Sequence, residues 1–437
     1  MVGITRLLDW RSRPAMTAVP GRTGGATAPG RRTTAVPLGL LFLTLLGTLP
    51  SPLKVPFLGV SLQNLAVPLG SMALVALLWP QRTRVWRAAL PLLPATIALV
   101  GWGLVVSALS DHPDLSLRYW IKSLAYLVVF AGFLFLFSVP SLHAASYLTL
   151  YCFLAGLALT GVVEMAFPAS AVFRAFRTAD SLLCYPRIAS LLSSPNTYGV
   201  LMVLGLTLGE RLRAGNRLRG VTYAAAATLF TFQLAQSGSR NAWLVLAGAL
   251  AWMAIRRMMS PWRAAALAAG LALSLVVLPV PARQAGIKVP AAIPQARFLV
   301  RDGDMQSTAL CPAPVTFNLR RALWREAVSE FRRRPLQGIG LGVFQWTGGL
   351  KIMGKEGYDT HDLPLKILVE TGLVGLLLSA AWLVPALRCW PAASDLAEVA
   401  VVAVMGGQVF DLFVHDYTHT TILMLAWASF VSRRRDA

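Results

Sequence analysis

The stretch that decides the fold runs from residue 119 to residue 138 and reads YWIKSLAYLVVFAGFLFLFS. It holds only one charged side chain. About twenty apolar residues in a helix span roughly 30 Å, the thickness of the hydrocarbon core of a bilayer, so we expect a transmembrane helix here. Further apolar stretches of this kind predict more such helices. They cover residues 35–52, 56–79, 88–108, 142–167, 190–209, 219–236, 241–256, 263–281, 363–387, 394–412 and 418–432.

The composition agrees with a chain that lies mostly in a membrane. Of its 437 residues, 56% are hydrophobic and 14% are charged. A soluble domain carries about a quarter charged residues, whereas a transmembrane β-barrel shows alternating segments of about ten residues, a pattern absent from this sequence. The sequence therefore predicts an all-α polytopic membrane protein with about twelve transmembrane helices.

The formal net charge of +21 comes mostly from short basic clusters between the apolar stretches. Such clusters set the orientation of membrane helices, so they argue against a nucleic-acid-binding surface. When all the expected helices are drawn, these clusters, which include Arg211 and Arg256, fall on one face, predicted to be cytoplasmic. The outward face is then expected to hold the loops 109–118, 168–189, 237–240, 282–362 and 413–417. The expected order is a disordered cytoplasmic arm (1–34), helices (35–281), a large periplasmic loop (282–362), further helices (363–432) and a cytoplasmic tail (433–437).

The loops on the outward face keep many arginines. Outward loops are normally poor in basic residues, so these arginines favour an anionic ligand on that side. Binding to anionic lipid headgroups, or salt bridges within the loops, is the alternative. The arginines are Arg174, Arg177, Arg187, Arg240, Arg297, Arg301, Arg320, Arg321, Arg325 and Arg332 to Arg334.

Two short motifs place polar residues at expected helix starts. In QSGSRNAW (236–243), Arg240 stands at the outer start of a helix, where unpaired N–H groups attract anions. A bound phosphate would offset the repulsion between this arginine and the helix dipole. Alternatively, Arg240 extends to lipid headgroups and Ser239 caps the helix. The second motif, from Arg187 to Asn196, leads into another helix, which its polar residues could simply cap.

The only long hydrophilic stretch, residues 281–362, is predicted to cover a site at the membrane surface. An amphipathic helix is expected within it, and its apolar face would hold Leu319, Leu323, Trp324, Ala327, Val328 and Phe331. Arg320 and Arg321 fall on or beside the opposite face, where a solvated basic surface is the simpler interpretation. The glycines of 338–342 are expected to allow a turn and close backbone approach.

His361 stands directly before the next apolar stretch, as a near-neutral base beside the outward arginines. Asp362, Lys366 and Glu370 recur every four residues and predict one polar stripe on a membrane helix. Mutual neutralisation is the interpretation we favour for Lys366 and Glu370. His415, in the last outward loop, could join the same site or anchor the helix at the interface.

Metal ligands are sparse in the sequence. The four cysteines show no CxxC or His-paired spacing, and Asp302-Gly-Asp304 is too short a match to a metal-binding Asp-x-Asp motif to carry weight. Cys184 and Cys311 are both expected on the outward side, where they could form a disulfide. No metal and no cofactor are expected.

Four motifs in order resemble the O-antigen ligase superfamily. They are Pro-Arg187 with Ser194-Pro-Asn196; Ser239-Arg240-Asn-Ala; Arg320-x-x-x-Trp324 followed by Pro335-Leu-x-Gly-Ile-Gly-Leu-Gly-Val-Phe344; and His361 followed by Glu370-Thr-Gly-Leu-Val-Gly-Leu. The resemblance covers about residues 185–377. Asp362 departs from the family pattern, in which an asparagine commonly follows this histidine.

The resemblance implies a GT-C-like glycosyltransferase of the bacterial inner membrane with a periplasmic active site. Its donor would be a glycan on undecaprenyl pyrophosphate, and its acceptor a sugar hydroxyl of the lipid A core. The reaction would invert the anomeric carbon without a metal. The implied site has His361 as base or phosphate stabiliser and a pyrophosphate clamp of Arg187, Arg240, Arg320 and Asn196, with Arg321 as substitute for Arg320. Further candidates are Ser239, Asp362 and His415.

Three alternatives share part of this pattern. O-antigen polymerases and protein O-oligosaccharyltransferases resemble the chain in the same motifs and differ in acceptor. Oligosaccharyltransferases of this type often carry a sizeable soluble C-terminal part, so the short tail after the last expected helix favours a ligase or polymerase. A transporter of lipid-linked glycans would predict broken or charged helices at matching positions of two repeats, and no such repeat is visible.

Overall fold

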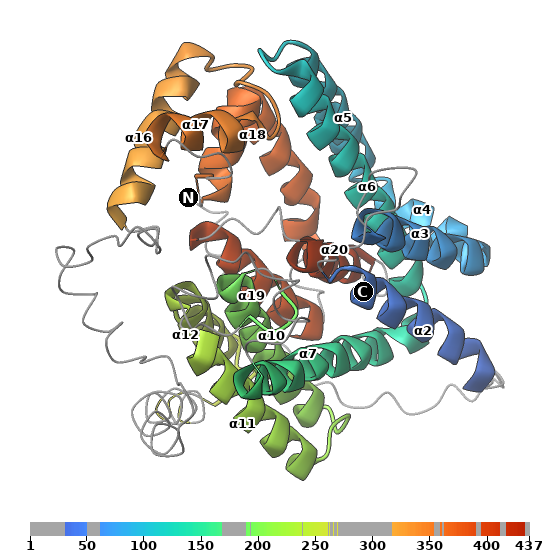
Figure 1. Cartoon of the computed structure of the whole chain (residues 1–437). Helices are drawn as coiled ribbons and strands as arrows, with labels where there is room; N and C mark the ends of the chain where they lie inside the picture. Colours follow the sequence, from blue (N-terminus) through green and yellow to red (C-terminus); the bar gives the residue numbers. More distant parts are fainter. Residues whose placement is uncertain are drawn as a thin grey trace, which may run out of the picture. The chain divides into compact units, whose positions relative to one another are not determined.

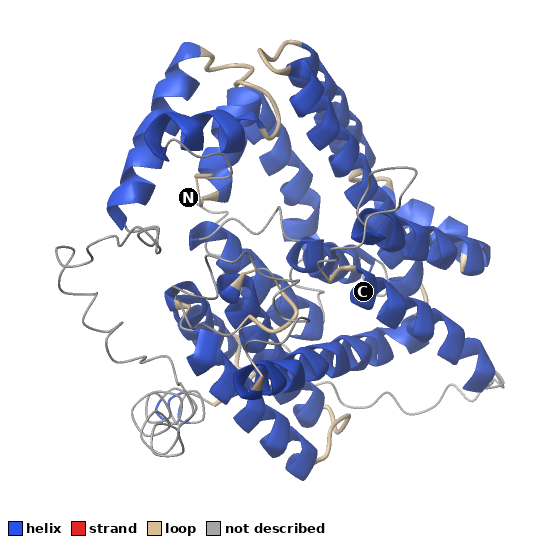
Figure 2. Cartoon of the chain, viewed as in Figure 1, coloured by secondary structure: helices blue, strands red, loops and turns tan. Residues whose placement is uncertain are grey.

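In this computed structural model, the structure describes residues 31–49, 62–167, 189–192, 194–237, 239–260, 262, 265, 269, 317–353, 359–360, 362–389, 395–410 and 417–432. The chain divides into residues 1–36, of which only the start of the first helix is described, and residues 37–437. All regular elements of the described residues are helices (Figure 2).

The helices follow one another along the chain (Figure 1). They are α2 (Arg31–Gly47), α3 (Leu62–Leu77), α4 (Arg82–Ala89), α5 (Leu93–Ala108), α6 (Pro113–Phe137), α7 (His143–Ala166), α10 (Pro195–Ala214), α11 (Gly220–Ser237), α12 (Arg240–Ile255), α16 (Phe317–Arg333), α17 (Val343–Met353), α18 (Leu363–Cys389), α19 (Asp395–Phe410) and α20 (Tyr417–Ser432). Two of them, α4 and α17, were not predicted. Each predicted apolar stretch overlaps one of the helices, except 263–281, of which only residues 265 and 269 are described.

Several of these helices suit a membrane. Among the described residues, Pro113–Phe137, Pro140–Ala166 and Leu363–Val384 are long and apolar enough to cross one. Gln63–Leu77 and Trp79–Ala89 pass the same test together but are bent by 69°. The apolar helices Thr34–Gly47, Leu93–Ala108, Asn241–Ile255 and Leu396–Met405 are shorter. An all-helical fold suited to a membrane is therefore confirmed for this part of the chain, and the number of spans stays a prediction.

The best-buried helix is α10. Its side chains are buried without interruption from Thr197 to Glu210, because α7, α11, α12 and α19 surround it. A helix that is apolar on every side belongs in the interior of a bundle. Within a membrane such packing depends on close van der Waals contact, since lipid is as apolar as the core.

Polar contacts join loops that the sequence predicts on the same side. Arg334 donates from Nη2 to Oδ1 of Asp111 over 2.8 Å, which links the two outward segments 109–118 and 282–362. On the side predicted to be cytoplasmic, Arg211 donates from Nη1 to the carbonyl oxygen of Met258 over 2.6 Å. Both contacts agree with the predicted alternation of loops.

The helix α18 is interrupted at Gly372, whose φ of 68° and ψ of −172° are not helical. The loop that begins at Pro335 lies in this break. The N–H of Leu373 donates to the carbonyl oxygen of Pro335 over 2.8 Å, and Ile339 donates to the carbonyl of Val369 over 3.0 Å. The loop thus satisfies backbone groups that the break removes from the helical ladder, as a membrane requires.

The close approach depends on glycine at two positions. A Cβ on Gly372 would lie 2.1 Å from the carbonyl oxygen of Leu336, and one on Gly338 would lie 2.4 Å from the carbonyl carbon of Glu370. Both residues also have positive φ, which side-chain-bearing residues rarely adopt. The predicted role of the 338–342 glycines, a turn with close backbone approach, is confirmed.

Candidate functional site

The first group of candidate residues lies at the starts of α10 and α12. Ser194 caps α10 by accepting a hydrogen bond from the N–H of Thr197, and Ser239 caps α12 by accepting one from the N–H of Ala242 over 3.2 Å. Both caps agree with the simpler interpretation of the two motifs. Arg240 is the first residue of α12, as predicted.

Gly199 brings these two helix starts together. A Cβ on Gly199 would lie 2.8 Å from Oγ of Ser237 and 2.9 Å from the Cβ atoms of both Ser239 and Ala242. The first turns of α10 and α12 are therefore in direct contact. Each helix start presents N–H groups and the positive end of a helix dipole, so their combination is favourable for an anion.

Glu164 of α7 fixes the segment that leads into α10. Its buried carboxylate, with the residue 1% exposed, accepts hydrogen bonds from the N–H groups of Ala189 and Ser190 over 3.2 and 2.7 Å. Ser190 has a φ of 55°, and its hydroxyl donates to the carbonyl of Leu157 over 2.9 Å. Glu164 was not predicted as a site residue, although a lone carboxylate in an apolar stretch indicates a functional role or a specific hydrogen-bond partner.

The second group lies on α16. Leu323 and Ala327 are fully buried and pack with Phe344 and Val369. Arg320 is half-buried on the same side of the helix, three and seven residues before these positions, whereas Arg321 is exposed. The orientation of α16 therefore favours Arg320, and not Arg321, as the arginine of the expected pyrophosphate clamp.

The apolar face of α16 differs from the predicted one at Val328, which is exposed. The buried stripe is rotated toward Arg320 because α16 packs on α17 and α18. Trp324 takes part in this packing: its indole Nε1 donates to the carbonyl oxygen of Thr360 over 2.7 Å. Thr360 directly precedes His361 in the chain, so α16 is bonded to the segment that carries the proposed base.

The predicted polar stripe on α18 is correct for two of its three residues. Lys366 and Glu370 form an ion pair of 2.8 Å, as predicted. Asp362 does not join them, because its Oδ1 accepts a hydrogen bond from the N–H of Leu365 at the start of α18. The second partner of Lys366 is Asp359. Asp359 was not predicted, because it precedes α18 and lies outside the four-residue spacing of the polar stripe.

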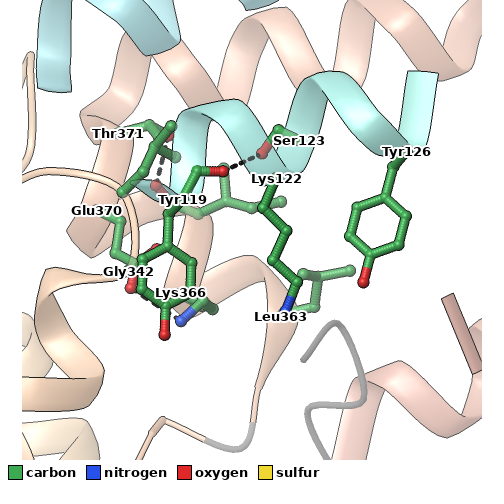
Figure 3. Close-up of a pocket in the computed structure, with 11 residues that line it drawn as sticks. Tyr119, Lys122, Ser123, Tyr126, Gly342, Leu363, Lys366, Glu370 and Thr371 are labelled. Carbon is green, nitrogen blue, oxygen red and sulfur yellow. Dashed lines mark hydrogen bonds and ion pairs between the residues drawn. The ribbon is translucent and has the colours of Figure 1, made fainter. Parts of the chain in front are cut away.

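A pocket of about 140 Å³ lies between α6, the glycine loop and the first part of α18 (Figure 3). Tyr119 extends from α6 toward Lys366 on α18, and Lys122 extends from α6 toward Leu363. The hydroxyl of Tyr119 donates to Oε1 of Gln345 over 3.0 Å. The α6 residues were not predicted as part of a site, because on the sequence they belong to an ordinary apolar stretch.

Several predicted site residues lie outside the description. Arg187, His361 and His415 are not among the described residues, nor are the Cys184–Cys311 pair and the Asp302 motif, and only the backbone of Arg240 is described. Asn196 is described as a half-buried residue in the first turn of α10. Within the described ranges, no three His, Cys, Asp or Glu side chains are grouped so as to hold a metal ion.

The comparison with known families supports one of the classes of protein that the geometry allows. Residues 224–380 match the family model described as O-antigen ligase. The resemblance to the O-antigen ligase superfamily is confirmed. The match begins in α11 and ends within α18, so it contains Ser239, Arg240, Arg320, the glycine loop and Glu370. No curated protein matches the chain.

The match supports a function like that of O-antigen ligases and polymerases, which are glycosyltransferase-like membrane enzymes. The family implies a lipid-linked glycan as donor and a lipid acceptor. The two contacting helix starts, and separately the half-buried arginine on α16, are groups that can stabilise negative charge on a departing phosphate.

Proposed function

We propose that this chain transfers a glycan from undecaprenyl pyrophosphate to a sugar hydroxyl of the lipid A core, at the periplasmic face of the bacterial inner membrane. The observation that carries the proposal is the position of Arg320. It lies on the buried side of α16, beside Trp324, whose indole is bonded to the residue before His361. An arginine on a helix that is bonded to the residue before the expected base suits pyrophosphate departure with deprotonation of an acceptor.

The proposed reaction is a direct displacement at the anomeric carbon. The acceptor oxygen forms a bond to this carbon on the face opposite the pyrophosphate, and the bond from the carbon to the pyrophosphate oxygen breaks, so the configuration inverts. His361 takes the proton of the acceptor hydroxyl; as a cation it would instead stabilise the leaving phosphate. The pyrophosphate leaves with its negative charge held by Arg187, Arg240 and Arg320.

The contact between the starts of α10 and α12 supports the role of Arg240. An arginine at a helix start is repelled by the helix dipole, and a bound pyrophosphate would remove this repulsion while accepting hydrogen bonds from N–H groups of the first turn. Asn196 lies in the first turn of α10 and is proposed as a further donor to the pyrophosphate. Arginines supply the positive charge here, so the reaction is expected to need no divalent cation.

A gel of the lipopolysaccharide from a deletion strain tests the proposal. We expect loss of all polymer from the lipid A core, with long polymer accumulating on its lipid carrier. A core that carries a single repeat unit would indicate an O-antigen polymerase instead. Unchanged lipopolysaccharide with an altered glycoprotein would indicate a protein O-oligosaccharyltransferase.

A further inference from the structure

Lys366 is a buried cation in the first part of α18. It is 6% exposed and lies between two buried carboxylates, Asp359 and Glu370. Replacing a buried ion pair with apolar side chains of similar volume is often neutral or stabilising. Stability alone therefore gives no reason to keep a lysine here, and a role in fixing geometry is the better explanation.

One side of Lys366 is attached to the interrupted helix. Its Nζ donates to Oε1 of Glu370 over 2.8 Å. The backbone of Glu370 is fixed in turn, because its carbonyl oxygen accepts a hydrogen bond from the N–H of Gly340 in the glycine loop over 3.0 Å. The ion pair with Glu370 therefore attaches Lys366 to a part of α18 whose backbone is hydrogen-bonded to the glycine loop.

The other side of Lys366 reaches the segment before α18. Its Nζ donates to Oδ2 of Asp359, whose Oδ1 accepts the N–H of Thr360 over 2.7 Å. Thr360 also donates from Oγ1 to the carbonyl oxygen of Asp362 over 2.9 Å. The described residues on either side of His361 are therefore joined to each other and, through Asp359, to α18.

We propose that Lys366 is a positioning residue, which fixes Asp359 and Thr360 against α18 and so sets the place of the base in the reaction. This inference rests on the proposed function, in which His361 acts on the acceptor proton. Lys366 acts through Asp359 and has no contact with substrate in this account. Removing the lysine should slow the chemical step and leave donor binding unchanged.

The chain contains a matched control in Lys351. Like Lys366, it lies between two carboxylates, with Nζ 2.9 Å from Oε1 of Glu326 and a second ion pair to Glu330. These contacts join α17 to α16 at the surface, and Lys351 is exposed. Lys351→Met removes the same kind of interaction without touching the segment before α18.

The decisive variant replaces all three charges, as Asp359→Asn, Lys366→Met and Glu370→Gln together. It leaves no unpaired charge in the core, so it is expected to fold. In lipid nanodiscs, hydrogen exchange of peptides covering residues 359–366 should become at least about fivefold faster. With lipid-linked polymer as donor and core lipid as acceptor, kcat should fall about tenfold or more while the donor KM stays within about twofold.

Lys351→Met should change neither the exchange of residues 359–366 nor kcat. The inference is overturned if the triple variant keeps wild-type exchange, because Lys366 then does not fix the segment. It is equally overturned if exchange rises while kcat is unchanged, or if the donor KM rises as much as kcat falls. If the wild-type protein transfers no glycan, the proposed function is wrong. The hydrogen-exchange measurement would still show whether Lys366 fixes Asp359 and Thr360.

Discussion

At the scale of single residues, neighbouring arginines on α16 have different surroundings. Arg320 is half-buried on the side of Leu323 and Ala327, whereas Arg321 is exposed. The sequence analysis named both, because a short amphipathic stretch leaves the helix register open by one residue. The packing of α16 against α18 fixes this register, and a single sequence carries no signal for it.

Arg320→Ala should lower the rate of glycan transfer about 100-fold, because it removes a cation expected to stabilise the leaving pyrophosphate. Arg321→Ala is the matched control and should stay within about twofold of the wild type, as its side chain is exposed. Initial rates with purified, folded variants provide the measurement. Equal losses for the two variants would show that the basic surface as a whole, and not Arg320, acts on the donor.

At the scale of elements, the interrupted helix depends on Gly372. Gly372→Ala should lower the melting temperature of the purified protein by several degrees, because a Cβ would meet the backbone of Leu336 at 2.1 Å and the positive φ is unfavourable by about 1–3 kcal/mol. Gly101→Ala, on α5, is the control: a Cβ there would meet nothing within 4 Å. A melting temperature for Gly372→Ala equal to that of the control variant would show that the break is not required.

The contact between α16 and α17 predicts a pH dependence. Burial alone would raise the pKa of Glu330, but the hydrogen bond and charge of Lys351 outweigh this effect and lower it. Hydrogen bonds from Glu330 and Glu326 raise the pKa of Lys351. The stabilisation from Glu330 is thus present above the usual carboxyl pKa and is lost as pH falls through the lowered value. The stabilisation from Lys351 is present below the usual pKa of a lysine side chain and is lost only as pH rises through the raised pKa of Lys351.

Lys351→Met should therefore lower stability at neutral pH and have no effect in strong acid. The cost at neutral pH should be about 0.5 kcal/mol, since Lys351 is partly solvated and the pair is screened. Melting temperatures of the wild type and the variant, compared between about pH 3 and pH 8, give the measurement. A difference that persists unchanged at the acid end would contradict the assignment.

Much of the secondary structure was predictable from the sequence. The apolar stretches predicted most of the described helices, and serines before apolar runs predicted the caps of α10 and α12, since both signals are local. The helices α4 and α17 were not predicted. Contacts made across the fold were not predictable. Asp359 pairs with Lys366 from outside the helical repeat, and Glu164 reaches a segment far along the chain, so no spacing rule identifies either of them.

At the scale of the whole molecule, the residues of interest lie within the matched family region and before it. Residues 224–380 match O-antigen ligases, while Glu164, the α10 start and the α6 side of the pocket precede this segment. If the proposed function is correct, it requires more of the chain than the matched region. Under that proposal, Arg320 of α16 and the starts of α10 and α12 are expected to hold the pyrophosphate.

Glycan transfer by the purified protein, with lipid-linked polymer and core lipid as substrates, tests whether arginines stabilise the leaving pyrophosphate. We expect polymer to be joined to the core at the same rate with and without EDTA, because arginines and not a metal ion would stabilise the pyrophosphate. We also expect loss of transfer, by about 100-fold or more, in folded Arg240→Ala and His361→Ala proteins. Transfer at wild-type rates by both folded variants would contradict this expectation.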